Sequence, residues 1–139
     1  MDPERIERVL AAQPNYAHHL GFRMVSVTDE ETVAELTVTE ELLNRDGVLH
    51  GGAVMSLADN LGGTSTFLYL QDDEFTTTSE SKTNFFRSIE AGDVARAVAR
   101  LLHNGRRTKV WQTSIYRGDG KLAAQVTQTQ MILKRGARE

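Results

Sequence analysis

Apolar and polar residues recur with two different periods along the first half of the chain. Near the N-terminus the apolar residues have helical spacing, which predicts a short amphipathic helix over residues 3–12 with Pro3 at its first position. Residues 22–28 and 32–39 are rich in residues that favour strands and in part alternate, which predicts two strands. Residues 52–70 are nearly free of charge and long enough for one central helix.

The second half of the chain has the composition and the turn signals of strands. Residues 93–103 fit either an amphipathic helix or an alternating strand, so their own pattern leaves both open. The dipeptides Asn104-Gly105 and Asp119-Gly120 decide for a strand, because both are strong hairpin signals. Four strands are therefore predicted, over residues 75–87, 93–103, 106–117 and 121–133.

This order of elements predicts an α+β fold in which an antiparallel sheet is covered by one long helix. The 139 residues suit a single domain over residues 1–139. A net charge of −3 argues against a dedicated nucleic-acid binder, and the absence of cysteine excludes disulfides and thiolate nucleophiles. No membrane-spanning segment or signal peptide is expected, and the cytoplasm is the compartment we expect.

The most informative segment is the step His50-Gly51-Gly52 at the start of the predicted central helix. Glycines at a helix start let backbone N–H groups approach a ligand oxygen where the helix dipole favours negative charge. Asp59 follows inside the same helix, where a lone carboxylate among apolar residues needs a function. An oxyanion-type donor and an isolated carboxylate together indicate acyl chemistry.

The segment from Asn44 to Asp59, followed by the predicted meander, resembles the hotdog-fold acyl-CoA thioesterases. The type it is most similar to is the PaaI-like thioesterases of phenylacetic acid degradation. His50 follows Asn44 by six positions and Asp59 follows His50 by nine, and this combination is specific where a bare His-Gly-Gly would be weak. The resemblance covers about residues 15–134. It implies a hotdog fold, in which an antiparallel sheet wraps around the central helix.

The resemblance also implies a role for each matching residue. The backbone N–H of Gly51 would polarise the thioester carbonyl. Asn44 and His50 would shape the loop and help to orient the carbonyl or the water. Asp59 would be the general base for water, or a nucleophile as in some members, and Thr78 would be the strand hydroxyl that positions the water.

The identity of this hydroxyl is left open by a departure from the family pattern. Some relatives carry a hydroxyl residue one helical turn after the acid. This chain has Gly63 at that position and Thr64 beside it.

The spacing of Gly51 and Asp59 has a consequence for assembly. Eight residues of helix separate them by roughly 12 Å along the axis, which is too far for both groups to serve one thioester. Two antiparallel helices related by a two-fold axis bring the Gly51 of one chain to the Asp59 of another. We therefore expect a homodimer with shared active sites, and the resemblance implies a homotetramer built as a dimer of dimers.

The expected substrate is an acyl-CoA, with coenzyme A as part of the substrate and with no separate cofactor or metal. Its phosphates need cations, and arginine suits them by its planar fork. The candidates lie at the end of one predicted strand and around the Asn104-Gly105 turn. They are Arg87, Arg106, Arg107 and Lys109.

Two other functions stay open from the sequence. Asp46 and His50 are four apart, superficially like the acid–histidine pair of the hotdog hydratases and dehydratases, but this reading leaves Asp59 without a role. A non-catalytic sensor of CoA esters is the second alternative, and the retained Asp59 argues against it. Structural roles for Asn44 and His50 as turn and cap residues are compatible with all three. The sequence does not identify the acyl group.

Overall fold

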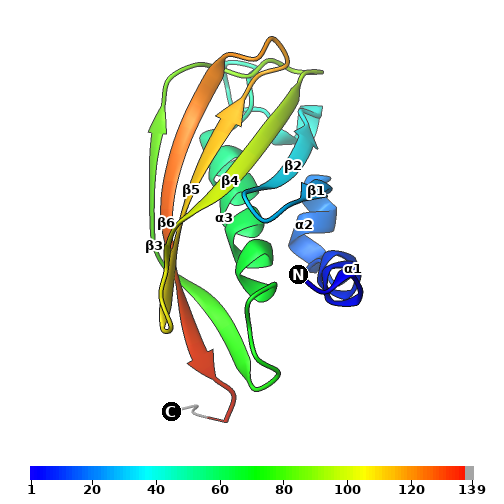
Figure 1. The fold of residues 1–139 in the computed structure, drawn as a ribbon. Helices are drawn as coiled ribbons and strands as arrows, with labels where there is room; N and C mark the ends of the chain where they lie inside the picture. The colour runs from blue at the N-terminus through cyan, green and yellow to red at the C-terminus, as the bar shows by residue number, and fades with distance from the viewer. Residues whose placement is uncertain (137–139) are drawn as a thin grey trace.

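One long helix, α3 (Gly51–Phe67), lies against the concave face of a six-stranded antiparallel sheet (Figure 1). The computed structural model describes residues 1–136. The short helices α1 (Pro3–Ala11) and α2 (Asn15–Leu20) lie beside α3 on the side away from the sheet, and a 3-10 turn, η1 (Glu40–Leu42), precedes it. The strands are β1 (Arg23–Val27), β2 (Thr32–Thr37), β3 (Glu74–Phe85), β4 (Val94–Asn104), β5 (Thr108–Tyr116) and β6 (Leu122–Lys134).

The strands follow the order β1-β2-β4-β5-β6-β3 across the sheet. Strands β4, β5 and β6 form the expected meander, so the hairpin signals at Asn104-Gly105 and Asp119-Gly120 are confirmed. Strand β3 pairs with β6 along its whole length and is one edge of the sheet. This arrangement confirms the predicted α+β class and the hotdog fold.

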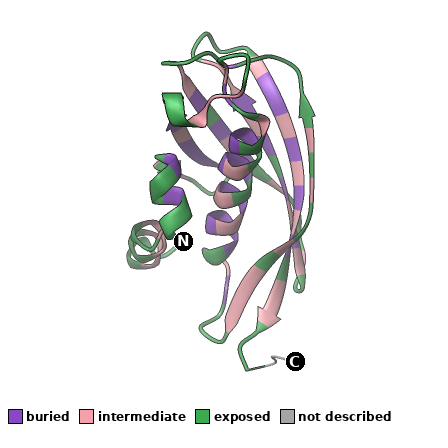
Figure 2. Cartoon of the chain, turned by 180° about the vertical axis from the view of Figure 1, so that it is seen from behind, coloured by how far each residue is buried: buried purple, intermediate pink, exposed green. Residues whose placement is uncertain are grey.

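Helix α3 is buried on the face that meets the sheet (Figure 2). Leu57, Ala58 and Leu61 are fully buried in the core that it shares with β2, β4, β5 and β6. The helix also buries polar residues, because their hydroxyls bond back to its own carbonyls: Ser65 Oγ donates to Leu61 O at 2.7 Å and Thr66 Oγ1 donates to Gly62 O at 2.8 Å. A lone helix therefore fits inside the sheet without unpaired hydroxyls at these positions.

Two details differ from the expectation. Helix α3 ends at Phe67 rather than residue 70, because its last turn tightens to three-residue hydrogen bonds such as Tyr69 N to Thr66 O at 2.9 Å. Helix α2 was not predicted, since it is short; Ala17 and Leu20 bury its inner face and Gly21 ends it at φ 80°. Within residues 1–136, no helix has the length and apolar character needed to cross a membrane.

Candidate active site

The start of α3 presents one free backbone donor. His50 is the N-cap residue, and its Nδ1 accepts a hydrogen bond from Gly52 N at 2.8 Å. In neutral His50 this places the ring proton on Nε2, so Nε2 is a donor. The Gly51 N–H makes no hydrogen bond to any residue in the described part of the chain, and it lies at the positive end of the helix dipole.

Asn44 shapes the loop that leads into this helix start. Its Oδ1 accepts from Asp46 N at 2.9 Å and from Val48 N at 3.2 Å, and Gly47 turns the chain at φ 77°. Asn44 and Gly51 thereby line one pocket of about 390 Å³ together with Phe85, Phe86 and Arg87. The structure thus brings together three predicted residues, Asn44, Gly51 and Arg87, and places His50 beside them as the cap.

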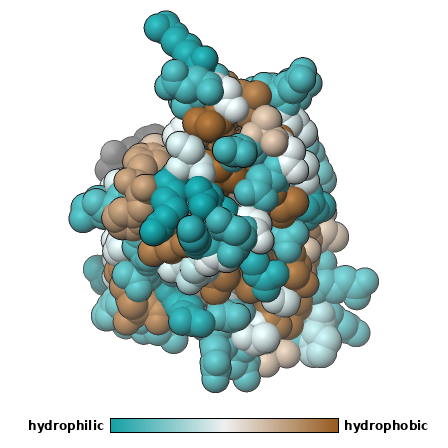
Figure 3. Space-filling view, turned by 90° about the horizontal axis from the view of Figure 1, so that it is seen from above, coloured by the Kyte–Doolittle hydropathy of each residue, from teal (hydrophilic) through white to brown (hydrophobic). Residues whose placement is uncertain are grey.

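Two exposed aromatic side chains flank this pocket. Phe85 and Phe86, at the end of β3, are 53% and 55% exposed. At this end of the molecule, apolar side chains are exposed between hydrophilic ones (Figure 3). The ring of Phe85 would lie 3.4 Å from a Cβ atom at Gly51, so the aromatic edge and the helix start are in contact distance.

Asp59 lies two helical turns further on, exposed in the single chain. Its Oδ1 accepts a hydrogen bond from Thr78 Oγ1 at 2.6 Å and a long one from Gln128 Nε2 at 3.4 Å. No donor within residues 1–136 reaches Oδ2. The two hydroxyl candidates are therefore separated: Thr78 contacts Asp59, whereas Thr64 is bonded to Gln13 at 3.3 Å.

A buried layer behind Thr78 was missed by the sequence reasoning. Gln130 faces Thr78 across the β3–β6 ladder and donates from Nε2 to Thr78 Oγ1 at 2.6 Å. Gln128 and Gln130 are 0% and 1% exposed. The signal was available in the sequence, because both amides fall on the inward-facing positions of β6, where apolar residues are usual.

The strand carrying Thr78 is irregular at this point. The β3–β6 register shifts between Thr78 and Glu80, which leaves Ser79 as the extra residue of a bulge. Bulges of this kind bend a strand and re-aim its side chains. The irregularity therefore lies directly beside the hydroxyl that contacts Asp59.

Asp59 and Thr78 line a second, larger pocket of about 580 Å³ between α3, β3 and the N-terminal helices. Gln13, from the segment between α1 and α2, accepts a hydrogen bond from Asn60 Nδ2 at 2.9 Å on its wall. Gly63 also lines this pocket, and a Cβ there would have nothing within 4 Å. The neighbouring Gly62 is different, since a Cβ there would lie 2.5 Å from the carboxamide of Gln128.

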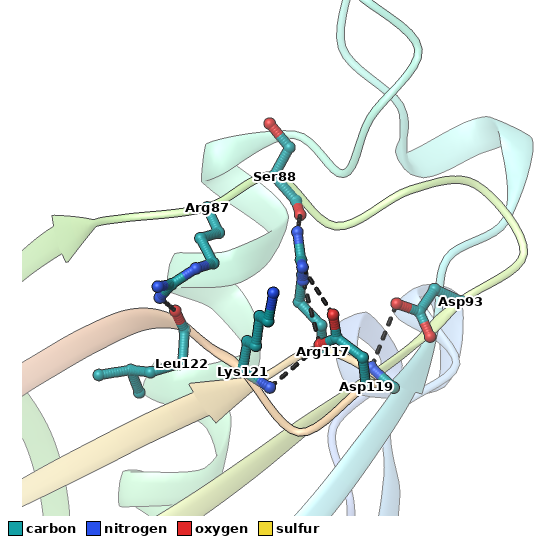
Figure 4. Close-up of polar contacts among 8 residues, drawn as sticks. Arg87, Ser88, Asp93, Arg117, Asp119, Lys121 and Leu122 are labelled. Carbon is teal, nitrogen blue, oxygen red and sulfur yellow. Dashed lines mark hydrogen bonds and ion pairs between the residues drawn. The ribbon is translucent and has the colours of Figure 1, made fainter.

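The predicted phosphate-binding cations are spread over two ends of the sheet. Arg87 donates from Nη1 to the carbonyl of Leu122 at 2.7 Å, close to Lys121 (Figure 4). Arg106 and Arg107 are exposed in the β4–β5 turn, at the opposite end of the sheet (Figure 1). Lys109 is only 6% exposed, bonds to Asn104 and Gly105 O, and burial lowers its pKa. Of the four, Arg87 alone lies beside the helix start.

Comparison with known protein families identifies the family of the chain, and the matched segment contains most residues of this site. The family model described as the thioesterase superfamily matches residues 46–124, which include the helix start, Asp59, Thr78 and Arg87. The chain belongs to this superfamily. The expected enzyme class, a thioester hydrolase, is confirmed by this membership and by relatives that are named as thioester hydrolases. The expected resemblance to the PaaI-like proteins is confirmed for the fold.

Similar proteins span most of the chain. PA1618 of Pseudomonas aeruginosa is 34% identical over 118 residues, which are 84% of this chain and 81% of that protein. The crystal structure of a mutant of thioesterase PA1618 superposes with a TM-score of 0.89 over 96% of both chains, at 30% identity. The 1,4-dihydroxy-2-naphthoyl-CoA hydrolase of Escherichia coli is 31% identical over 119 residues, 86% of this chain and 87% of the relative.

The fold likeness extends to the PaaI protein of the E. coli phenylacetic acid degradation operon. Its structure has a TM-score of 0.85 and covers 95% of this chain and 96% of that one. At 24% identity this likeness concerns the fold alone.

Proposed function

We propose that the chain hydrolyses acyl-CoA thioesters to a carboxylic acid and coenzyme A. One observation carries the proposal: a free N–H at the start of α3 and a carboxylate anchored by one oxygen lie on the same helix, about 12 Å apart along its axis. Each has the chemistry of half of a thioesterase site. That an E. coli relative is named as a CoA-ester hydrolase supports the choice of substrate.

The two halves complete each other across a two-fold axis. Strand β3 is a long edge strand, and it ends in the exposed Phe85 beside the exposed Phe86. A long unpaired edge with apolar side chains is a surface on which another chain can dock. A second copy placed there with α3 antiparallel to the first puts the Gly51 of one chain opposite the Asp59 of the other.

In the proposed reaction the thioester carbonyl accepts a hydrogen bond from Gly51 N–H. The helix dipole then stabilises the negative charge that develops on this oxygen. Asp59 of the other subunit takes a proton from a water molecule as the water oxygen attacks the carbonyl carbon, and Thr78 holds the carboxylate. The carbon–sulfur bond breaks and coenzyme A leaves as a thiolate, which needs no strong acid because a thiol has a pKa of about 8.5.

Arg87 and Lys121 are our candidates for the phosphates of coenzyme A. Both lie at the β5–β6 end of the sheet, and Arg87 lines the pocket at the helix start. Arg106, Arg107 and the buried Lys109 are too far along the sheet to join them in one chain. Replacing Arg87 with Met should raise KM about tenfold with little change in kcat, because it removes a charge-assisted bond made equally in the ground state.

A thiol-release assay over a panel of acyl-CoA esters tests the function. Activity on at least one ester, abolished by Asp59→Asn, supports the proposal. Hydration of an enoyl-CoA without thiol release would favour a hydratase, and binding without turnover would favour a sensor. Sedimentation of the same sample measures whether the chain forms the dimer that we require or the tetramer that the resemblance implies.

A further inference from the structure

A buried glutamine, Gln130, belongs to a chain of hydrogen bonds that ends on Asp59. Thr76 Oγ1 lies 2.9 Å from each of two acceptors, Gln130 Oε1 and Met131 O, and Gln130 Nε2 donates to Thr78 Oγ1 at 2.6 Å. Thr78 Oγ1 in turn donates to Asp59 Oδ1 at 2.6 Å. The donors of Gln130 and Thr78 both point toward the carboxylate.

The direction of this chain follows from proton counting. A hydroxyl carries one proton, so a Thr78 oxygen that accepts from Gln130 has its own proton free for Asp59. A flipped Gln130 amide would turn its oxygen toward Thr78 and compete with Asp59 for that proton. The flip is opposed by Asp59 itself: a carboxylate only accepts, so Thr78 donates to it and needs a donor, Nε2, from Gln130.

Gln128 adds a second donor to the same carboxylate oxygen, and this contact leaves the oxygen of its own amide unpaired. Its Oε1 is buried without a hydrogen-bond partner among the described residues, and an orphan amide oxygen is destabilising. Turning the amide over would instead set this oxygen against the carboxylate of Asp59. The unpaired Oε1 of Gln128 is therefore the consequence of directing its Nε2 toward Asp59.

Gly62 makes room for this amide. A Cβ at Gly62 would lie 2.5 Å from Cδ and Oε1 of Gln128, so the carboxamide rests directly on the helix backbone. Gly62 is three residues after Asp59, which places both on the same side of the helix. The glycine, the amide and the carboxylate thus form one packed unit.

We propose that Gln128 and Gln130 are positioning residues that hold Asp59 through Oδ1 and leave Oδ2 as the oxygen that meets the reacting water. Gln130 acts through Thr78, and Gln128 acts directly. This inference rests on the proposed thioesterase function. Neither glutamine touches the substrate in this account, so their loss should lower kcat and leave KM unchanged.

The test is a double-mutant cycle on the purified full chain. Gln130→Met keeps the volume of the side chain and removes its bond to Thr78, so kcat should fall about tenfold. Thr78→Val should lower kcat further, and the double variant should have the kcat of Thr78→Val alone, because Gln130 has no other route to Asp59. Gln125→Met is the matched control. Gln125 also lies on β6, but it accepts a hydrogen bond from Ser114 Oγ at 3.1 Å and does not contact Asp59, so the kcat of this variant should stay at the wild-type value.

Two results would overturn the inference. One is a Gln130→Met kcat within about twofold of wild type, and the other is a double variant whose loss equals the product of the single losses. If Gln130→Met fails to fold, Gln128→Met tests the direct contact with Asp59; its kcat should fall at an unchanged KM, and an unchanged kcat would contradict the inference.

The same assay separates this inference from the proposed function. A wild-type chain that releases no thiol from any ester, or an Asp59→Asn variant that is fully active, refutes the function itself. An active wild type that depends on Asp59 but not on Gln130 refutes only the positioning role.

Discussion

Two carboxylates of this chain are held in opposite ways. Asp119, in the β5–β6 turn, has both oxygens occupied by Arg117, at 3.2 Å and 2.6 Å, and also accepts from Lys121 N at 3.0 Å (Figure 4). Asp59 meets no cation within the described residues and is held through one oxygen by neutral donors. The first arrangement fixes a turn, whereas the second leaves an oxygen and a pocket for chemistry.

This difference is the one that the role proposed for Asp59 requires, because a carboxylate that takes a proton needs an oxygen that its partners leave free. The ion pair of Asp119 satisfies its charge, so nothing is left to react. The neutral donors of Asp59 orient it without cancelling its charge.

Asp59→Asn should lower kcat by about 100- to 10,000-fold, because an amide cannot take a proton from water. The carbonyl oxygen of the new amide still accepts from Thr78, so the melting temperature should stay near that of the wild type. Thiol release and thermal unfolding measure the two quantities. A variant that loses activity and fold together would show that Asp59 is structural, like Asp119.

Gly51→Pro should remove the free N–H and keep the helix. Proline is favoured at the first helical position, and His50 already has the extended backbone (ψ 135°) that a residue before proline prefers. We expect kcat to fall about 100- to 1000-fold, as for other oxyanion donors. Gly51→Ala retains the N–H and is the control, with near wild-type kcat; equal activity of the two variants would exclude the Gly51 N–H from the reaction.

The adjacent glycines Gly62 and Gly63 should respond oppositely to alanine. A methyl at Gly62 displaces Gln128, so Gly62→Ala should destabilise the fold by about 1–3 kcal/mol and lower kcat. Gly63→Ala adds a methyl in open space and should stabilise the helix by about 1 kcal/mol, with effects on activity confined to KM. Denaturant unfolding and steady-state kinetics compare them. A stabilised Gly62→Ala variant would contradict the packed unit.

Asp119 should show the smallest effect, confined to acid pH. The guanidinium of Arg117 lowers the pKa of Asp119 from 3.8 to about 2. Because the folded-state pKa is lowered, its stabilising contribution is complete above about pH 4 and is lost as the pH falls through about 2. An NMR titration of its carboxyl carbon should have a midpoint near 2 and return toward 3.8 in Arg117→Met. Asp119→Asn should leave kcat unchanged.

The sequence allowed the sheet, the central helix and the motif residues to be predicted, because each has a local signal. Hydrophobic alternation marks the strands, Asn104-Gly105 and Asp119-Gly120 mark the hairpins, and His50-Gly51-Gly52 marks the helix start. Thr78 was placed by the resemblance alone, since its contact with Asp59 joins two elements 19 positions apart and lies beside a bulge in β3. These signals are local or belong to a known pattern.

What the sequence left open depends on long-range packing. Gln128 and Gln130 reach the site because β6 pairs with β3. The residues near them in the sequence do not indicate that their side chains contact Asp59 or Thr78. The close approach of Gly62 to Gln128 could not be predicted for the same reason, since the two residues are 66 positions apart. Lys109 was chosen for its charge, but the β4–β5 turn buries it against Asn104 and Tyr69.

If each active site takes Gly51 from one chain and Asp59 from another, two inactive variants should restore activity in a mixed dimer. Asp59→Asn and Gly51→Pro chains are each nearly inactive, but a mixed dimer contains one site with both native groups. Native mass spectrometry can monitor the exchange of subunits until half of the dimers are mixed. Each mixed dimer has one intact site out of two, so about a quarter of wild-type activity should return. Activity that stays at the level of the two parents while mixed dimers are present would contradict the shared site.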